Sequence, residues 1–205
     1  MEKVKVLLWD LGGVLIPFSH GRLWRNFLRM LPIGVSIGLL FKRAELQQKL
    51  FRPLDDFEKG LCSFDDLKDA VEKELGIILD RERFRTAWND IFGKTGETAA
   101  FARKLHEKYP CFVLSNTNVE HLEYVKNKAP ELLFMDGFIP SYEVHALKPE
   151  KEFYERALEI VGEKAENCLL IDDRLENVEG ARAVGIQAVL YRGLSKLKEG
   201  LNGKI

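Results

Sequence analysis

The first clear feature of the chain is a short apolar run that ends at an acidic residue. Residues 4–9 are apolar except for Lys5, and Asp10 follows them directly, ahead of Gly12 and Gly13. A short apolar run that is closed by a glycine turn is typical of a buried parallel strand. Because open α/β sheets bind ligands beyond the carboxyl ends of their strands, Asp10 is the first candidate functional residue.

Residues 17–95 show a helical pattern of apolar positions without a convincing strand. Ser63, with Asp66 three positions later, has the pattern of a capping box, and Gly76 closes the helix that it opens. Asp55 before Phe57 predicts a second helix start in the same way. We therefore expect this segment to be entirely helical.

Beyond residue 96, apolar runs of strand length alternate with helical patterns. This alternation implies right-handed crossovers and a parallel sheet. The sequence predicts an α/β fold, with a Rossmann-like, doubly wound parallel sheet core of residues 1–16 plus 96–205 and an inserted α-helical domain of residues 17–95. The expected helices are 97–109, 119–126, 151–161 and 175–184, and the expected strands are 111–114, 137–139, 168–171 and 187–191.

The composition favours a small-molecule partner. At 205 residues and 46% hydrophobic content the chain can bury a sizeable core. Its 31 basic and 32 acidic residues nearly cancel, so no global field recruits nucleic acid or an anionic membrane. Three cysteines without a C-x-x-C pair argue against a disulfide framework or a zinc site. Together with an N-terminus that lacks a signal-peptide pattern, they predict a cytoplasmic protein.

The longest apolar stretch, residues 30–41, is interrupted by Pro32 and Gly34 and is shorter than a membrane span. We interpret it as part of a buried or pocket-lining helical segment. The alternative is an amphipathic segment on a membrane surface, with a basic flank made of Arg22, Arg25 and Arg29.

Three of the expected strands end in residues that can bind or react. Asp10 follows the first strand, residues 115–118 follow the second, and Asp172 and Asp173 follow the strand 168–171. Residues of these types are also common helix caps and turn residues. Repelling carboxylates at one sheet edge favour a hard divalent cation such as Mg²⁺. Lys148 adds a positive charge ahead of a helix, although a single lysine is ordinarily a solvated surface residue.

Four segments contain these residues in order: DLGGVL from Asp10, LSNTN up to Asn118, LKPE around Lys148, and IDDRLENVEGA from Ile171. They resemble the ordered motifs of the haloacid dehalogenase-like (HAD) superfamily. Residues 17–95 resemble its helical cap in pattern only, through FEKG followed by SFDD. Within the superfamily the chain is most similar to subfamily IA, in the branch of sugar-1-phosphate phosphatases and the phosphatase part of epoxide hydrolases.

The resemblance implies a phosphohydrolase. Asp10 would be the nucleophile, which attacks phosphorus and forms an aspartyl-phosphate that water then hydrolyses. Ser115 and Asn116 would bind phosphoryl oxygens. Lys148 would bind phosphate and offset the charge on the nucleophile and on the transferring group.

The resemblance also implies Mg²⁺ as the cofactor. Asp173, together with Asp10 and the carbonyl of Gly12, would hold the ion, and Asp172 would do so directly or through water. The remaining polar residues of the last motif, Arg174 and Asn177, would position its loop.

One position departs from the superfamily pattern. Two residues after the nucleophile most of its phosphatases carry a second Asp as general acid and base, but this chain has Gly12. The loss of a general acid costs about 10²–10⁴-fold for a poor leaving group. The enzyme would therefore act on substrates that leave readily or borrow an acid, for which His20 and His145 are candidates. Each histidine is nevertheless more typical of a structural residue.

Two other interpretations remain open. Haloacid dehalogenases also lack this acid, since a halide leaves without a proton. They resemble one another in working without a metal, however, whereas the adjacent Asp172 and Asp173 favour Mg²⁺. Alternatively, the protein is a catalytically impaired binder of phosphorylated ligands, against which the retained Asp10 and Lys148 weigh.

The insertion is expected to close over the site and to select a small phosphorylated metabolite. Aromatic side chains in such a segment are more typical of a cap core, and arginines of a solvated helix face. Neither the substrate nor the oligomeric state can be predicted. The candidate substrate-facing residues are Phe18, His20, Arg22, Trp24 and Arg25, with His145 from the core.

Overall fold

The computed structural model describes residues 4–203 and 205, apart from the side chains of 37–47, 50 and 51. Within this part of the chain the core is a five-stranded parallel sheet in the order β3-β2-β1-β4-β5. The four strands after β1 begin at the predicted residues, and the predicted α/β fold is confirmed. The strands are β1 (Val6–Asp10), β2 (Cys111–Ser115), β3 (Gly137–Pro140), β4 (Cys168–Asp172) and β5 (Gln187–Leu190).

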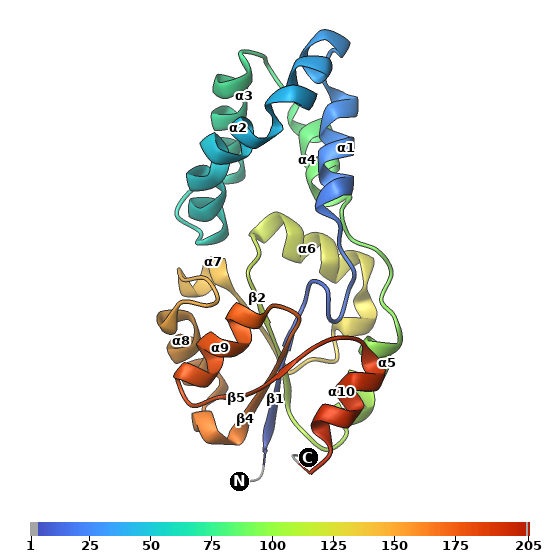
Figure 1. Ribbon diagram of the computed structural model, residues 1–205, viewed down its shortest axis with the longest axis vertical. Coiled ribbons are helices and arrows are strands. Elements are labelled where there is room, and N and C mark those ends of the chain that lie inside the picture. The colour runs from blue at the N-terminus through green and yellow to red at the C-terminus, as the bar shows by residue number, and fades with distance from the viewer. Residues whose placement is uncertain (1–3, 204) are drawn as a thin grey trace.

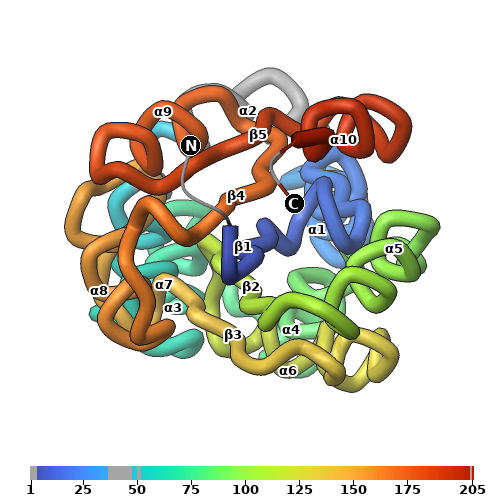
Figure 2. The backbone as a smooth tube through the Cα atoms, turned by 90° about the horizontal axis from the view of Figure 1, so that it is seen from below, coloured from blue at the N-terminus to red at the C-terminus, as the bar shows by residue number. Residues whose placement is uncertain are grey.

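Helices cover both faces of the sheet. The side chains of β1 alternate between the faces, so each face has apolar side chains that a layer of helices buries. Leu7 and Trp9 pack on one face and Val6 and Leu8 on the other. Figure 2 shows the two groups of helices on opposite sides of the strands. The first face carries α5 (Glu97–His106), α6 (Val119–Lys128) and α10 (Leu194–Leu201), and the second α8 (Lys151–Val161) and α9 (Leu175–Ala183).

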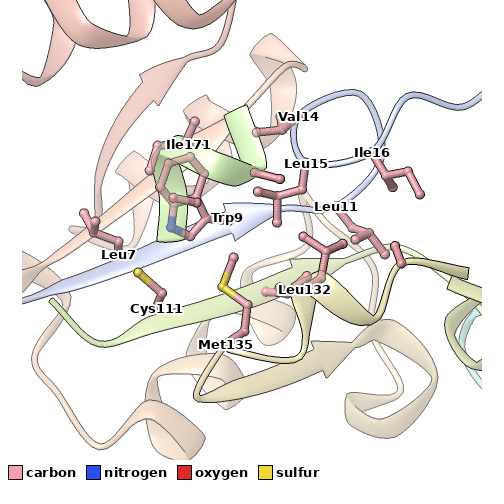
Figure 3. Close-up of a cluster of buried hydrophobic side chains, with 14 of the residues drawn as sticks. Leu7, Trp9, Leu11, Val14, Leu15, Ile16, Cys111, Leu132, Met135 and Ile171 are labelled. Atoms are coloured by element: carbon pink, nitrogen blue, oxygen red, sulfur yellow. The ribbon is translucent and has the colours of Figure 1, made fainter. Parts of the chain in front are cut away.

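Trp9 is the largest fully buried side chain of the core. It lies among apolar neighbours that include Cys111, Met135 and Ile171 (Figure 3). Shorter elements complete this domain and were not predicted. They are α7 (Ser141–Val144) and the 3₁₀ turns η1 (Pro130–Leu132) and η2 (Ala165–Asn167).

The chain leaves the sheet after β1 and returns at α5, and the insertion between them is helical as expected. Ser63 forms the predicted capping box with Asp66, and Gly76 ends the helix in the left-handed conformation. Aromatic side chains form the core of the insertion, among them Phe57, Phe64 and Trp88. The helices are α1 (His20–Met30), α2 (Ile33–Glu58), α3 (Phe64–Leu75) and α4 (Arg81–Asn89).

The predicted helix start at Asp55 is wrong. Helix α2 continues through Pro53 and Asp55 to Glu58. Leu54 and Phe57 both pack into the insertion core, so the helix gains apolar contacts by continuing past the polar position.

The described side chains at the start of residues 30–41 are buried only in part. Leu31 is buried, and Met30 and Val35 pack partly buried against the insertion core, whereas Ile33 is 80% exposed. The apolar side chains from residue 37 onward lie outside the described residues. None of the described helices combines the length and the apolar character that crossing a membrane requires.

Two connections link the insertion to the core. Phe18 and Phe92 form an antiparallel bridge between these connections, and the Ser19 N–H donates to the carbonyl of Ile91 at 3.0 Å. Figure 1 shows the insertion above the carboxyl ends of the strands, with the end of α2 close to α7. The insertion therefore faces the edge of the sheet where the candidate residues lie.

Candidate active site

The ends of β1 and β4 bring three carboxylates together. In the sheet register Asp10 pairs with Leu114, and Trp9 pairs with Ile171, so adjacent strands end at one level. Asp10, Asp172 and Asp173 each offer a carboxylate oxygen, and these oxygens all lie within 4.8 Å of one another. The predicted cluster of acids is therefore present at this edge.

Lys148 lies in the middle of this cluster and is only 3% exposed. Its Nζ donates to Asp10 Oδ1 at 2.6 Å, to Asp172 Oδ2 at 2.7 Å and to the Leu114 carbonyl at 2.9 Å. Three bonds use all three ammonium protons. Lys148 thus fixes the orientation of Asp10 and places a positive charge beside it.

The electrostatics of the cluster leave a negative balance. Burial raises the pKa of Asp10, Lys148 opposes this, and the Asp172 carboxylate adds to it. Burial alone would lower the pKa of Lys148, but the Asp10 and Asp172 carboxylates outweigh it and raise that pKa. Burial and then Asp172 raise the pKa of Asp173. Three acids around one ammonium group form a set of oxygen donors that fits a divalent cation.

The two adjacent acids play different parts. Asp172 is fully buried, and its carboxylate accepts from Lys148, from the Arg174 N–H at 2.9 Å and from Asn177 Nδ2 at 3.0 and 3.1 Å. Asp173 instead lines the cavity described below. The structure therefore presents Asp173 to a ligand and uses Asp172 to order the loop and Lys148.

Asn116 holds the Lys148 loop. Its Oδ1 accepts from the Lys148 N–H at 2.7 Å, and its Nδ2 donates to the Lys148 carbonyl at 2.8 Å. The side chain of Asn116 therefore positions Lys148, a contact that the sequence did not reveal. Ser115 is buried at the end of β2 and lines the cavity beside Asp10.

The two glycines after Asp10 have different reasons to be glycine. Gly13 has a φ of +86°, and a Cβ there would lie 2.3 Å from Asp173 Oδ2. A Cβ at Gly12 would lie 3.0 and 3.1 Å from two ring carbons of Phe18. A side chain at position 12 would therefore press against the aromatic ring of Phe18.

A cavity of about 640 Å³ lies between the insertion and the core. Its core side is polar and includes Asp10, Ser115, Lys148 and Asp173. Its insertion side is mostly apolar and is formed by Phe18, Leu23, Leu54, Trp88, Ile91 and Phe92, together with His20, Asp55 and Glu58. The cavity therefore has a charged floor and a largely apolar wall.

Comparison with known proteins identifies the family. The family model of haloacid dehalogenase-like hydrolases matches residues 4–185. The chain belongs to this family. The predictions of the superfamily and of a hydrolase are thereby confirmed.

This haloacid dehalogenase-like hydrolase is similar to a solved enzyme structure and to two fungal enzymes. A HAD family enzyme of Bacteroides thetaiotaomicron, solved with magnesium and inorganic phosphate, is 28% identical over 95% of this chain and 98% of that chain, with a TM-score of 0.80. The sesquiterpene phosphatase astK of Aspergillus oryzae is 23% identical over 89% of this chain and 87% of the phosphatase. The drimenol cyclase drtB of Aspergillus calidoustus is 28% identical over 92% of this chain, which spans only 34% of the cyclase.

The candidate substrate residues of this haloacid dehalogenase-like hydrolase divide into two groups. Phe18 and His20 line the cavity, and their rings meet edge to face at 4.9 Å. Arg22, Trp24 and His145 are not among the lining residues. Arg22 donates to the Phe92 carbonyl at 3.3 Å, and Trp24 packs partly buried against the insertion core. Arg25 is also absent from the lining.

His145 holds the insertion to the core. Its Nδ1 donates to the carbonyl of Lys59 at 2.8 Å, and Ser141 Oγ donates to the carbonyl of Glu58 at 2.7 Å. Lys59 Nζ also pairs with Glu150 at 2.7 Å. These contacts, which we call the α2–α7 junction, fix the end of α2 against the core.

The sequence did not reveal three ionisable residues of the cavity wall: Asp55, Glu58 and His121. Burial raises the pKa of Glu58 to about 7; Asp55 adds to the rise and Arg174 opposes it. Burial lowers the pKa of His121 to about 4, and its ring nitrogens bond to Asn118 and to the Trp88 carbonyl. His121 is therefore neutral and structural. The FEKG segment contains Glu58, but in the sequence it indicated only a resemblance to a helical cap and gave no role to Glu58.

Proposed function

We propose that this hydrolase is a Mg²⁺-dependent phosphatase that cleaves phosphate monoesters with a largely apolar organic group. Asp10 forms the aspartyl-phosphate intermediate. The observation that carries the proposal is the position of Asp10 at the charged floor of the cavity, 2.6 Å from Lys148 Nζ and beside Asp173.

The donor set supports Mg²⁺ as the cofactor. Asp10 and Asp173 would hold the ion together with the Gly12 carbonyl, and Asp172 would contribute through water because both its oxygens already accept hydrogen bonds. When bound, the ion supplies charge neutralisation for the phosphoryl oxygens. The magnesium and phosphate complex of the Bacteroides relative supports the same cofactor.

The residues of the chain would perform two displacements. In the first, a carboxylate oxygen of Asp10 bonds to phosphorus, and the bond between phosphorus and the substrate oxygen breaks. The Ser115 hydroxyl donates to a phosphoryl oxygen, while Lys148 keeps Asp10 oriented and offsets negative charge. In the second, water attacks phosphorus, inorganic phosphate leaves and the Asp10 carboxylate is restored.

The residues of the cavity wall support the proposal that the substrate carries an apolar group. Its insertion side presents six apolar side chains and few hydrogen-bonding groups, whereas a sugar needs several such groups. The similarity to a sesquiterpene phosphatase supports the same substrate class. This proposal narrows the predicted small phosphorylated metabolite to one with an apolar body. The predicted domain boundaries and the cytoplasmic location stay predictions.

Phosphate release from a set of esters tests the proposal. The set contains p-nitrophenyl phosphate, glucose 1-phosphate, glucose 6-phosphate and straight-chain alkyl phosphates of increasing length, each with Mg²⁺ or with EDTA. We expect Mg²⁺-dependent release whose kcat/KM rises with chain length, by about fourfold for each buried CH₂ group. A preference for the sugar phosphates would contradict the substrate class. Chloride release from 2-chloropropionate in EDTA, without phosphate release, would instead indicate a dehalogenase.

A further inference from the structure

The position at which related phosphatases carry their acid has no side chain in this chain. The residue there is Gly12, and the ring of Phe18 packs tightly against it, with ring carbons 3.0 and 3.1 Å from a Cβ placed at that position. Phe18 is in turn held by its bridge to Phe92. A proton donor for the leaving group must therefore come from another part of the cavity wall.

Most ionisable groups of the described cavity wall already have a different role or cannot donate a proton. Asp10, Lys148 and Asp173 form the charged floor, and Arg174 cannot release a proton at ordinary pH. His121 is neutral, and its Nε2 proton is bonded to the Trp88 carbonyl at 3.1 Å. The groups that remain belong to the insertion: His20, Asp55 and Glu58.

Glu58 is the best placed of these groups. It is the last residue of α2, and its carbonyl accepts from Ser141 Oγ at 2.7 Å. The next residue, Lys59, bonds to His145 and Glu150 within the α2–α7 junction. The backbone that carries the Glu58 side chain is therefore fixed to the core from both sides of the peptide.

The other two groups are less suited. Asp55 already forms an ion pair with Lys59, at 3.7 Å. His20 is an exposed residue at the first position of α1, against the edge of Phe18. Among the residues that the structure describes, no hydrogen bond or ion pair engages the Glu58 carboxyl group, so its proton can go to a ligand.

The surroundings of Glu58 also keep it protonated near neutral pH. The side chain is half-buried, and burial is the main reason that its pKa rises to about 7, well above that of an ordinary glutamic acid. Asp55 on the same helix adds to the rise, and Arg174 from the start of α9 opposes it. The charged groups of the floor, Asp10, Lys148 and Asp173, border the same cavity. A carboxylic acid with such a pKa is suited to general acid–base catalysis.

We propose that Glu58 is the catalytic acid and base that replaces the residue missing at position 12. As Asp10 bonds to phosphorus and the ester P–O bond breaks, the leaving oxygen takes the Glu58 proton and departs as an alcohol. The Glu58 carboxylate then takes a proton from the water that attacks phosphorus, which restores the acid and releases phosphate. This inference rests on the proposed phosphatase function.

The dependence of rate on the leaving group tests this role. For wild type with Mg²⁺ we expect kcat/KM to vary little between aryl phosphates, whose leaving groups need no proton, and alkyl phosphates of similar size. In Glu58→Gln the alkyl-to-aryl ratio of kcat/KM should fall by about 10²–10³-fold. A change that merely disturbed the fold would lower both rates together. Glu58→Asp, which keeps the acid, should give an intermediate ratio.

Two control variants and a pH profile sharpen the test. Asp55→Asn, which changes a carboxyl of the same wall one turn away, and His20→Gln should both keep the wild-type alkyl-to-aryl ratio at pH 5.5, where Glu58 is protonated with or without the charge of Asp55. With alkyl phosphates, wild-type kcat/KM should fall as the pH rises above about 7, because Glu58 then loses its proton. In Glu58→Gln this decrease in kcat/KM at higher pH should be absent.

Three outcomes would overturn the inference. If His20→Gln, and not Glu58→Gln, lowers the ratio, His20 is the acid. If wild type already prefers aryl phosphates by about 10²-fold or more and Glu58→Gln leaves this preference unchanged, the enzyme works without an acid. Both results leave the phosphatase function intact. No turnover of any ester by wild type with Mg²⁺ would overturn the proposed function and this inference with it.

Discussion

Lys148 and Asp10 form an ion pair in the interior of the protein, with Nζ 2.6 Å from Oδ1 and side chains only 1% and 11% exposed. The residues are far apart in the sequence and meet because the loop before α8 passes over the end of β1. The same ammonium group binds Asp172 at 2.7 Å. One lysine therefore orients the proposed nucleophile and offsets two buried carboxylates.

Loss of Lys148 should destabilise the protein. In Lys148→Met two buried carboxylates lose their partner, which typically costs about 3–5 kcal/mol of the free energy of unfolding. Urea denaturation at pH 7 in EDTA measures this. Lys151→Met serves as the control, because Lys151 forms an exposed pair with Glu155 whose loss should cost less than about 1 kcal/mol. Equal losses in the two variants would contradict the account of the buried cluster.

Removal of Asp173 should weaken Mg²⁺ binding. Asp173→Asn loses one negative charge at the cavity floor, and we expect the dissociation constant for Mg²⁺ to rise by about tenfold or more. Isothermal titration of the free protein with MgCl₂ measures this without any substrate. Glu176→Gln, an exposed acid that pairs with Arg174, should bind as wild type does. An unchanged affinity in Asp173→Asn would remove Asp173 from the proposed set of ligands.

The α2–α7 junction should contribute to stability through Ser141. This fully buried hydroxyl accepts from the Thr117 N–H at 2.9 Å and donates to the Glu58 carbonyl. Ser141→Ala leaves a buried N–H without its partner, so we expect a loss of about 1–3 kcal/mol in thermal or urea denaturation. The exposed Ser195→Ala should change stability by less than about 0.5 kcal/mol. A neutral Ser141→Ala would show that the junction does not fix the insertion.

His121 should make stability fall in acid. Burial lowers its pKa in the folded state to about 4, below the ordinary value of 6.5. Between these two pH values the unfolded chain binds a proton at His121 and the folded protein does not. The contribution of His121 to the free energy of unfolding is therefore complete above pH 6.5 and is lost as the pH falls toward 4. The loss is at most about 3 kcal/mol.

Comparison with His121→Gln isolates this effect. The stability advantage of wild type over the variant, measured by urea denaturation, should shrink as the pH falls from 7 to 4.5. A difference that stays constant over this range would show that His121 is not held neutral.

The core of this fold could be predicted because its strands are short apolar runs with polar ends. Residues 168–171 were predicted as a strand, and β4 extends this only to Asp172. The Ser63 capping box is equally local and was also predicted. Where apolar packing overrides a local signal the prediction failed, as in α2, which continues past Asp55 because Leu54 and Phe57 bury against the insertion core. Helix α10 was missed altogether.

The residues of the charged floor could be predicted from the strand ends and the motifs, but the hydrogen bonds that hold them in place could not. Asn116 bonds to the backbone of Lys148, and Ser141 bonds to Glu58, across 32 and 83 positions of the sequence. Such contacts depend on the tertiary arrangement, and no local pattern encodes them. The same reason hid Glu58, whose burial arises only when α2 lies against the core.

The central claim is that Asp10 carries the phosphoryl group during turnover, and direct detection of that adduct tests it best. Wild type is mixed with p-nitrophenyl phosphate and Mg²⁺, quenched rapidly in acid and digested, and the peptides are measured by mass spectrometry. We predict one added phosphoryl group on the peptide that contains Asp10, absent with EDTA and in Asp10→Asn, which should also release no phosphate. Phosphate release by Asp10→Asn at the wild-type rate, with no adduct in wild type, would contradict the account.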